Sequence, residues 1–515
     1  MRERVILPVS GNVYPAKRRL SRRAVDRSLM RRAHPPGWGA EDCTMTPNRR
    51  TLLHAGVSVT ATLASATFAG QSPGPRDPRL PLKDDAESRA AAAQDFGHII
   101  QRQPRAVCKP GSSAEVADVL RWAKQQGLKV AARGQGHATY GRAMAEDGIV
   151  LDLGALTAIH RIEPDRVVVD AGATWHAVLD ATLAKGLVPL VLTNYLGLSV
   201  GGTLAVGGIG GSSSRHGLQT DQVLELDVVT GESVELTCSP TANADLFDAV
   251  RAGLAQCATI TRATLRLMRA PERVRRYLLS YPDLASLTAD QRRALDEARF
   301  DQLQGAVVPN GAGGWHYQLE AGVFYDGSMP PNDKALLAGL ADKRETVSDL
   351  AFGEDANAFA KLEKLLRSNG QWFNPHPWLL TYLRGSNALE IASEVIAGLD
   401  GDDLGPFGRI TYYPMFTDAC RTPLLRLPDE RVVFPFNLIR IPASADKANA
   451  ERQLARNRIL YDRIRAAGGM LYPVSALAMS SQDWMDHFGP RWPLLREARR
   501  RHDPGGILTP GYDLF

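Results

Sequence analysis

The sequence predicts an α+β protein with two domains, and three observations support this fold class. Helix and strand patterns alternate between residues 85 and 270, which indicates a first α+β domain. Between residues 271 and 475 long helical patterns alternate with long strands, as expected for an antiparallel sheet that is covered by helices and inserted as a second domain. Residues 476–515 return to loops and a helix, and we expect them to rejoin the first domain.

The first domain is predicted from helix–strand units with clear end signals. Ser112 and Glu115 have the spacing of a capping box, Gly127 ends the predicted helix, and residues 128–133 follow as a buried strand. The apolar face of this helix comprises Val116, Val119, Leu120 and Ala123. A second unit and further strands are predicted at residues 175–192, 166–172, 223–229 and 260–267.

The second domain is predicted from longer elements. Its expected helices cover residues 357–367 and 450–467, and its expected strands cover residues 314–326, 408–416 and 431–442. On the strand at 314–326 the side chains alternate, so that Trp315, Tyr317, Leu319 and Val323 share one face, and His316, Gln318 and Glu320 share the other.

Charge argues against a nucleic-acid partner. The 515-residue chain has a formal net charge of +5, 44% hydrophobic residues and 23% charged residues. Residues 1–44 hold ten basic and four acidic side chains, a net charge of +6, so the remaining chain carries a net charge of −1. A body that is close to neutral gives no electrostatic footprint for DNA or RNA.

The five cysteines predict neither a metal site nor a disulfide framework. Cys43, Cys108, Cys238, Cys257 and Cys420 include no C-x-x-C pair or other metal-like spacing, and their number is odd. We expect buried free thiols and no bound metal.

The first 84 residues are expected to lie outside the fold. Residues 1–44 are arginine-rich without an apolar period and are expected to be a disordered basic extension. A sharper interpretation is that they are not normally translated, because Met45 begins a segment, residues 45–70, with the layout of an export signal. Residues 71–84 then serve as a linker.

The arginines of this segment indicate the export route. Arg49 and Arg50 precede an uncharged stretch and are similar to a twin-arginine signal, with Asn48 where Ser or Thr is more usual. The alternative is a membrane anchor, but the stretch is short and rich in Ala and Thr. We therefore expect export to the periplasm or the outside of the cell, and no membrane span in the mature protein.

Three glycine-rich segments in the first domain indicate a large cofactor. They cover residues 132–141, 199–217 and 252–265. The first follows a strand, where backbone amides in a tight turn can hold a pyrophosphate, but its spacing is not the dinucleotide fingerprint G-x-G-x-x-G. Phosphate binding does not require a histidine, so His137 within this loop needs a separate explanation.

Motifs along most of the chain identify a family resemblance. In order they are "DFG", "ARGQGHATYG", "VGGTL", "RHG", "VLELDVVTG" with "TCSP", "NADLFDAV", "ITRA", "PHPWL", "DW" with "HFG", and "DPGGILTPG". The chain resembles the FAD-linked oxidases of the vanillyl-alcohol oxidase type, and within them the cytokinin dehydrogenases, over residues 95–515. The resemblance implies a two-domain fold in which residues 85–270 and 476–515 form an FAD-binding domain of the PCMH type and residues 271–475 form the substrate domain.

The resemblance implies FAD as the cofactor, with His137 bonded covalently to its 8α-methyl carbon. The alternative is that His137 only packs against the isoalloxazine ring. Ala138 stands where relatives have Ser, and Arg142 where they commonly have Gln. Gly197 occupies the position of a cysteine that forms a second link in some relatives, which excludes that link. The expected FAD-binding residues are Arg133, Gly134, Gln135, Gly136, His137, Ala138, Arg142, Ala143, Thr193, Asn194, Gly201, Gly202, Thr203, Gly207, Gly208, Gly211 and Ile260.

The catalytic position that the resemblance implies lacks its carboxylate. Cytokinin dehydrogenases use an Asp as proton acceptor, and the matching residue here is Asn194, whose amide is not a useful base at neutral pH. A second family acid matches Glu320, which either lines the pocket or lies on a solvated face. Tyr195, Tyr413 and His376 are further candidates. His376 lies between prolines, where a histidine is more often structural than catalytic.

These observations predict an FAD-dependent oxidoreductase that oxidises a small organic substrate at a C–N bond by hydride transfer to flavin N5. Oxygen or a quinone-like molecule is the expected electron acceptor. One alternative is an oxidase of an alcohol or sugar C–OH group. A second alternative is a flavin-holding binding protein that has lost catalysis.

Overall fold

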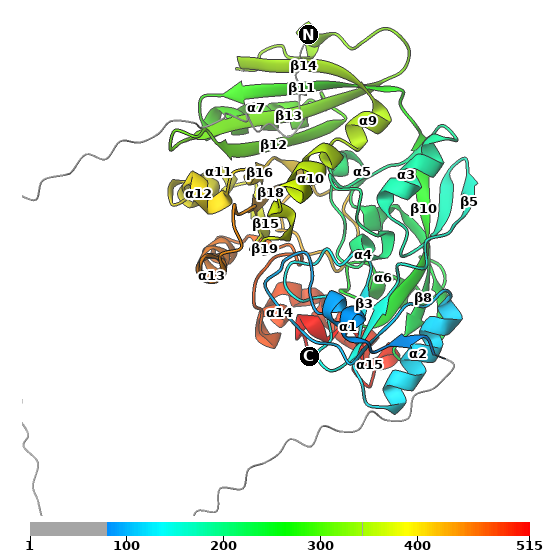
Figure 1. Cartoon of the computed structure of the whole chain (residues 1–515). Helices are drawn as coiled ribbons and strands as arrows, with labels where there is room; N and C mark the ends of the chain where they lie inside the picture. Colours follow the sequence, from blue (N-terminus) through cyan, green and yellow to red (C-terminus); the bar gives the residue numbers. More distant parts are fainter. Residues whose placement is uncertain (1–79, 342) are drawn as a thin grey trace, which may run out of the picture. The chain divides into compact units, whose positions relative to one another are not determined.

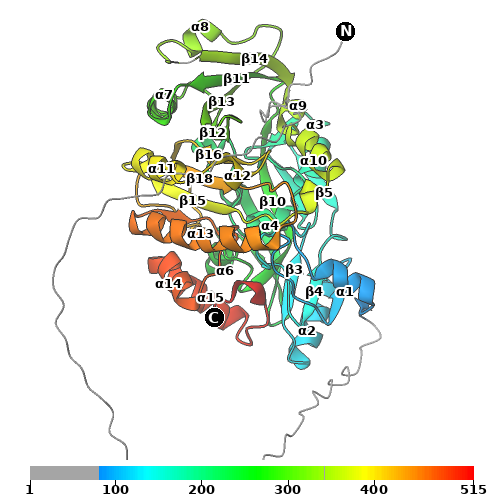
Figure 2. The same cartoon turned by 60° about the vertical axis from the view of Figure 1, so that its left-hand side comes forward.

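The computed structural model describes residues 80–341 and 343–515, which belong to one compact unit (Figures 1 and 2). The expected basic extension, the export signal and most of the linker lie outside the described residues. None of the helices in the described part is both long and apolar enough to cross a membrane. Four cysteines fall in the described ranges and are free thiols; Cys108, Cys238 and Cys257 are buried, whereas Cys420 is only partly buried.

A four-stranded sheet comes first, with the strand order β1-β2-β4-β3. Its strands are β1 (Leu82–Lys83), β2 (Ala106–Cys108), β3 (Val130–Arg133) and β4 (Ile149–Asp152). Strands β2, β4 and β3 are parallel, since helix α2 (Ser113–Gln125) carries the chain from β2 to the start of β3. A second short helix, α1 (Ala86–Ala92), precedes β2.

Helix α2 forms where the sequence predicts it, with one difference at its first turn. The predicted apolar face is fully buried, and Ser112 Oγ accepts a hydrogen bond from the Glu115 N–H at 3.2 Å. The Glu115 carboxylate accepts from the Gly111 N–H at 2.8 Å instead of returning to Ser112. The capping box is therefore half formed, because the carboxylate satisfies the amide one residue earlier.

A second sheet of six strands completes the first half of the chain. Its strand order is β5-β6-β10-β8-β9, and β7 pairs with the far end of β10. The strands are β5 (Ile159–Glu163), β6 (Arg166–Asp170), β7 (Leu187–Pro189), β8 (Val223–Thr230), β9 (Glu235–Cys238) and β10 (Ala258–Arg269). The helices are α3 (Trp175–Leu183), α4 (Val200–Leu204), α5 (Ser213–His216) and α6 (Ala244–Val250).

A nine-stranded antiparallel sheet forms the second half of the chain. Its order is β14-β11-β13-β12-β16-β18-β15-β19, with β17 paired to β18. The strands are β11 (Arg273–Tyr281), β12 (Gln302–Pro309), β13 (Trp315–Tyr325), β14 (Lys343–Ala351), β15 (Leu379–Arg384), β16 (Arg409–Tyr412), β17 (Met415–Phe416), β18 (Val432–Ile439) and β19 (Met470–Leu471). The strand predicted at residues 408–416 is divided into β16 and β17 around Pro414, which has no N–H to donate to a ladder.

Helices cover this sheet and continue to the C-terminus. They are α7 (Leu284–Asp296), α8 (Asp333–Leu336), α9 (Phe352–Ala356), α10 (Phe359–Ser368), α11 (Ala388–Ala397), α12 (Gly401–Leu404), α13 (Lys447–Ala466), α14 (Ser481–Phe488) and α15 (Trp492–His502). The long helix α13 lies beside β15 and β19 (Figure 2).

The register of the nine-stranded sheet separates an apolar face from a polar face. Leu319 of β13 packs in a core cluster with Leu287 of α7 and Ile391 of α11. Glu320, the next residue, projects to the other face. It pairs across the sheet with Gln304 of β12, in the row beside the pair of Thr411 and Asn437. Eight residues are called the polar face below: Arg276, Gln302, Gln304, Glu320, Arg409, Thr411, Tyr413 and Asn437.

The C-terminal segment packs back on the first sheet. Leu508 forms a parallel bridge with Val130 of β3. The Arg142 guanidinium is buried and donates to the carbonyl oxygens of Leu477 and Gly511, at 2.7 and 3.1 Å. Residues after β19 are thus held to the part of the chain that carries the glycine-rich loop.

Candidate functional site

A cavity of about 460 Å³ lies between the loops of the first two sheets and the polar face of the third. It is lined by residues from the glycine-rich loop, from the segment 189–212, from α9 and α10, from the polar face, and from the C-terminal segment. Because the two halves of the chain both supply its walls, a ligand in this cavity contacts both. Among the described residues, no group of three or more His, Cys, Asp and Glu side chains is placed to hold a metal ion.

The glycine-rich loop that follows β3 is fixed by the segment 95–97. The Phe96 N–H donates to the Gly136 carbonyl oxygen at 2.8 Å. The buried Asp95 carboxylate accepts from the Gly141 N–H at 2.6 Å. Burial raises the pKa of Asp95 to about 6, against the opposing effect of the hydrogen bonds that its carboxylate accepts from the Gly141 and Gly97 N–H groups. The motif "DFG" therefore positions the loop, a role that its sequence alone does not reveal.

The first two glycine-rich segments touch one another at a glycine. A Cβ atom on Gly134 would lie 2.0 Å from the Ser199 Oγ atom, so no larger residue fits there without a shift. This contact brings the loop of His137 next to the start of α4.

His137 projects into an aromatic cluster at one end of the cavity. We define this cluster as Phe96, His137, Tyr195, Trp372, His376 and Trp378, all of which line the cavity. The Phe96 ring stacks on both imidazoles, with centroid distances of 3.9 Å to His137 and 4.1 Å to His376. Burial, with smaller contributions from His376 and Arg367, lowers the pKa of His137 to about 3. Its imidazole is therefore neutral at physiological pH and has a free lone pair.

His376 presents an unused acceptor to the same end of the cavity. Its Nδ1 atom lies 3.1 Å from the Phe96 carbonyl oxygen, so Nδ1 carries the proton. Its buried Nε2 atom has no hydrogen-bond partner among the described residues. Burial lowers the pKa of His376 to about 3, so this atom is a neutral acceptor within the wall of the cavity.

Most of the predicted cofactor residues line the cavity, and four do not. Those on the wall are Gly134, Gln135, Gly136, His137, Ala138, Arg142, Ala143, Thr193, Asn194, Gly202, Thr203, Gly208 and Gly211. Arg133 points away, because its Nη1 atom donates to the Gln94 carbonyl oxygen under the loop. Ile260 is buried in the core of the second sheet, Gly201 packs against Ala171, and Gly207 lies against Leu425. These four positions support the site without facing it.

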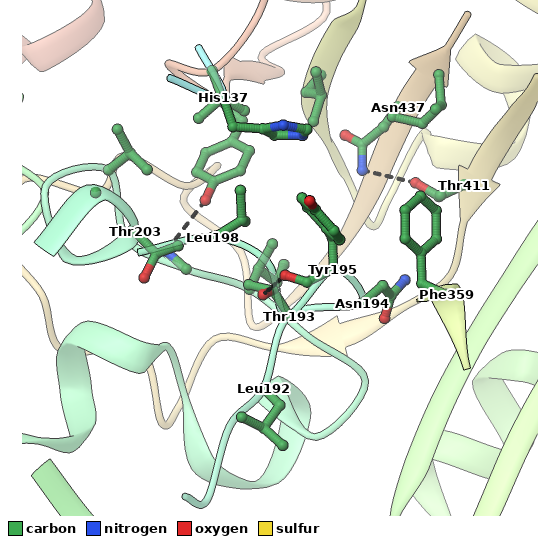
Figure 3. A pocket seen from close by; sticks show the side chains of 18 of the residues that line it. His137, Leu192, Thr193, Asn194, Tyr195, Leu198, Thr203, Phe359, Thr411 and Asn437 are labelled. Carbon is green, nitrogen blue, oxygen red and sulfur yellow. Dashed lines mark hydrogen bonds between the residues drawn. The ribbon is translucent and has the colours of Figure 1, made fainter. Parts of the chain in front are cut away.

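Asn194 and Tyr195 lie at the same end of the cavity but have different surroundings. The Asn194 amide is exposed and lies near Phe359 (Figure 3). The Tyr195 hydroxyl donates to Glu363 Oε1 at 2.9 Å, and burial together with Glu363 raises the pKa of Tyr195 to about 12. At neutral pH the Tyr195 hydroxyl is therefore protonated and engaged as a donor, and its catalytic role stays a prediction.

Glu320 lies on the cavity wall and not on a solvated face. The residue is 8% exposed, and its carboxylate accepts a hydrogen bond from Arg409 Nη2. Asn437 Nδ2 donates to Thr411 Oγ1 at 2.7 Å on the same face (Figure 3). Tyr413 is also buried there, and burial raises its pKa to about 12, so it too is a donor at neutral pH.

Sequence reasoning missed Arg276, Asp355 and Arg409. Arg276 Nη1 donates to Gln302 Oε1 at 2.8 Å, and its Nε atom lies 3.1 Å from Asp355 Oδ1. The alternation of polar residues on β16 could have revealed Arg409 once Glu320 was placed on a pocket-facing row. No local signal marks Asp355.

The geometry fits FAD. A loop with closely approached glycines, a neutral imidazole and an unpaired imidazole nitrogen contribute to one cavity, and the second half of the chain supplies the rest of its wall. The predicted α+β fold with an inserted antiparallel sheet is confirmed.

Comparison with known proteins identifies the family. Residues 104–239 match the FAD binding domain family, and residues 307–515 match the family described as cytokinin dehydrogenase 1, FAD and cytokinin binding. An uncharacterized oxidoreductase of the fasciation locus of Rhodococcoides fascians is 40% identical, over 83% of this chain and 97% of that protein. Cytokinin dehydrogenase 10 of Oryza sativa subsp. japonica is 32% identical, over 91% of this chain and 93% of that protein.

This chain belongs to the cytokinin dehydrogenase family. It is an FAD-dependent oxidoreductase. Cytokinin dehydrogenase 4 of Arabidopsis thaliana is also 32% identical, over 90% of this chain and 98% of that protein. The matched regions contain the loop of His137 and the residues Glu320, Asp355 and Arg409, whereas Arg276 lies between the two matched regions.

Solved structures show the same fold at low sequence identity. The crystal structure of 6-hydroxy-D-nicotine oxidase from Arthrobacter nicotinovorans aligns with a TM-score of 0.70 at 19% identity, over 86% of this chain and all of that one. Xylooligosaccharide oxidase from Myceliophthora thermophila aligns with a TM-score of 0.67 at 18% identity, over 83% and 95% of the two chains. The fold of the vanillyl-alcohol oxidase type is thereby confirmed.

Proposed function

We propose that this FAD-dependent oxidoreductase oxidises a small amine at a C–N bond, and that its FAD is linked covalently to His137. The observation that supports the amine is the composition of the cavity, whose wall contains both the aromatic cluster around His137 and the polar face. This arrangement suits a flat nitrogen heterocycle with an apolar side chain. Relatives that are 32% identical over nearly their whole length are named cytokinin dehydrogenases.

Bound FAD would supply the two-electron acceptor for a hydride from the substrate carbon. The residues of this chain would bind and orient the substrate. The aromatic cluster would exclude water and hold the ring system, and the Asn194 amide would hydrogen-bond the substrate N–H group. Donors and acceptors of the polar face would set the orientation of the heterocycle.

The environment of His137 supports the covalent link. A nucleophilic imidazole must be neutral, and burial keeps His137 neutral by lowering its pKa to about 3. The tight loop also gives the ring a fixed direction toward the cavity.

The electron acceptor and the location belong to the proposal as well. Oxygen or a quinone-like molecule would take the electrons from the cofactor. The twin-arginine-like pair Arg49 and Arg50 supports export to the periplasm or the outside of the cell.

An anaerobic screen tests the proposal and separates its alternatives. The purified holoenzyme is mixed without oxygen with amines, alcohols and sugars, and bleaching of the flavin absorbance is recorded. Bleaching by N6-substituted adenines or other secondary amines supports the amine substrate. Bleaching by alcohols or sugars alone would mean an oxidase of C–OH groups, and no bleaching by any compound would mean a binding protein without catalysis.

A further inference from the structure

Helix α10 forms one wall of the cavity and also belongs to the surface of the protein. Phe359, Leu362 and Leu366 lie on its inner side and line the cavity. Their spacing, at positions i, i+3 and i+7, places them on one face of the helix. Lys361 and Lys364 are exposed on the outer side. A single helix therefore separates this part of the cavity from solvent.

The preceding helix α9 is anchored more firmly than α10. Phe352 of α9 belongs to the core cluster of the second sheet, and Asp355 Oδ1 lies 3.1 Å from Arg276 Nε of β11. The buried part of α10 belongs instead to a separate, small apolar cluster. This cluster comprises Phe96, Leu362, Leu366, Trp372 and Ile441, all of which line the cavity. An element that packs on a cavity wall has less core to hold it than one that packs on a sheet, and such elements open more readily.

A hydrogen bond joins α10 to Tyr195, which lies in a different segment of the wall. The Tyr195 hydroxyl donates to Glu363 Oε1 at 2.9 Å. The same oxygen lies 2.8 Å from both Nε and Nη2 of Arg367, one turn further along the helix. Tyr195 lines the cavity, and Glu363 lies outside its wall. This bond therefore connects the helix to the wall residue from the outer side.

Four side chains form a closed ring of contacts beside His137. The Arg367 guanidinium lies 4.5 Å from the centroid of the Trp372 ring, and the Trp372 ring lies 5.5 Å from the Tyr195 ring, edge to face. The bond from Tyr195 to Glu363 and the pair of Glu363 and Arg367 complete the ring of contacts. Tyr195 and Trp372 also lie 5.0 and 5.8 Å from the His137 imidazole between ring centroids (Figure 3 shows His137 and Tyr195).

We propose that Glu363 is a positioning residue: by accepting from Tyr195, it holds α10 closed over the part of the cavity that contains His137. Opening is a movement of α10 about residues 357 and 358, which connect it to the anchored helix α9. The closed helix keeps its apolar face on the wall and excludes water from the site. This role concerns access to the cavity and does not depend on which substrate is oxidised.

Hydrogen exchange of the holoenzyme, followed by mass spectrometry, measures the opening of α10 directly. Tyr195→Phe removes the hydroxyl but leaves the aromatic ring and the pair of Glu363 and Arg367 in place. Glu363→Ala removes the acceptor. Each change should speed amide exchange in α10 about tenfold or more, because hydrogen bonds to charged groups are among the stronger ones in proteins. The double variant should exchange no faster than Glu363→Ala alone, since both changes remove the same bond.

Two variants and two internal references serve as controls. Glu363→Gln keeps an oxygen that accepts from Tyr195 and should retain most of the wild-type protection of α10. Lys364→Gln changes the exposed neighbour on the same helix and should leave the exchange unchanged. Strand β15 and helix α13 are the references, because a general loss of stability would speed exchange there as well.

Reduction of the flavin by dithionite in the absence of oxygen tests whether the opening of α10 admits small molecules. Dithionite reduces flavins directly, so the rate reports access to the cofactor and not the binding of a substrate. The flavin absorbance should bleach faster in Tyr195→Phe and Glu363→Ala than in wild type. The rate should be unchanged in Lys364→Gln.

The outcomes decide between a lid and a fixed wall. Unchanged exchange of α10 in Tyr195→Phe and Glu363→Ala would overturn the role of Glu363. Faster exchange in β15 and α13 as well as in α10 would assign the bond to general stability and also overturn it. Faster exchange of α10 without faster bleaching would show that this helix is not the barrier to the site. None of these results bears on the oxidation of an amine, which the anaerobic screen of substrates tests separately.

Discussion

The Asp95 carboxylate accepts a hydrogen bond of 2.6 Å from the Gly141 N–H and so fixes the far end of the loop that carries His137. Asp95→Asn replaces one acceptor oxygen with an amide donor and should cost about 1–3 kcal/mol of the free energy of unfolding. It should also lower the fraction of protein that retains flavin. Chemical denaturation and the ratio of flavin to protein absorbance measure both effects.

The free energy of unfolding that is lost on Asp95→Asn should decrease as the pH rises. Because burial raises the pKa of Asp95 from 3.8 to about 6, the folded state binds this proton more tightly than the unfolded state, and wild type loses stability as the pH rises from about 4 to 6. Asn does not titrate. The stability lost on Asp95→Asn should therefore be smaller at pH 7 than at pH 4, by on the order of 3 kcal/mol; a difference that grows with pH would contradict this account.

His137→Ala should abolish acid-stable flavin without unfolding the protein. The loop is held through backbone groups and Asp95, so removal of the imidazole leaves its frame in place. Wild type should stay yellow after acid precipitation, and the variant should release its flavin into the supernatant. Release of flavin from wild type would refute the covalent link.

Asn194→Asp should raise the rate at which isopentenyladenine bleaches the flavin. The change keeps the size of the side chain and adds a base where the family has one, which is worth roughly 10²–10⁴-fold where the substrate N–H lies opposite. Wild type should therefore react slowly with this compound. Fast bleaching of wild type in a stopped-flow experiment would show that Asn194 is no obstacle.

The ion pair of Glu320 and Arg409 should show strong coupling in unfolding experiments. Both side chains are mostly buried, with 10% and 13% of their surface exposed. Glu320→Gln leaves a buried guanidinium without its counter-charge and should cost about 3–5 kcal/mol. Adding Arg409→Met should recover part of this loss. If the losses of unfolding free energy, measured by guanidinium chloride denaturation, simply add, the two residues are not coupled.

Export should depend on Arg49 and Arg50. Replacing both with Lys keeps the charge but removes the guanidinium pair that the twin-arginine route reads. The variant should stay inside the cell, and N-terminal sequencing of exported wild type should find a start between about residues 66 and 78. Exported protein that still carries residues 1–44 would exclude a start of translation at Met45.

Local patterns predicted much of the fold and part of the site. The alternation on β13 placed Glu320 opposite the apolar side of Leu319, and the structure shows the same division. The motif around His137 was found because its residues are adjacent in the sequence. Helix α2 was predicted with its apolar face, since its period and end signals are local.

Contacts between distant residues were not predictable from one sequence. Tyr195 meets Glu363 168 residues away, and this bond turns a candidate base into a donor. Asp355 and Arg276 meet only because α9 packs on β11. Arg133 was expected at the cofactor, but its long side chain bonds to Gln94 instead, and strand position alone does not decide such a direction.

The return of the C-terminal segment has a consequence for the order of events during biosynthesis. Thr509 and Tyr512 form part of the cavity wall, and Leu508 pairs with Val130, a residue made almost 400 positions earlier. While the ribosome still encloses these last residues, the nascent first domain lacks the bridge to β3 and part of the cavity wall. Flavin loading should therefore follow release of the chain from the ribosome. A chain truncated shortly before residue 505 should be purified as colourless protein.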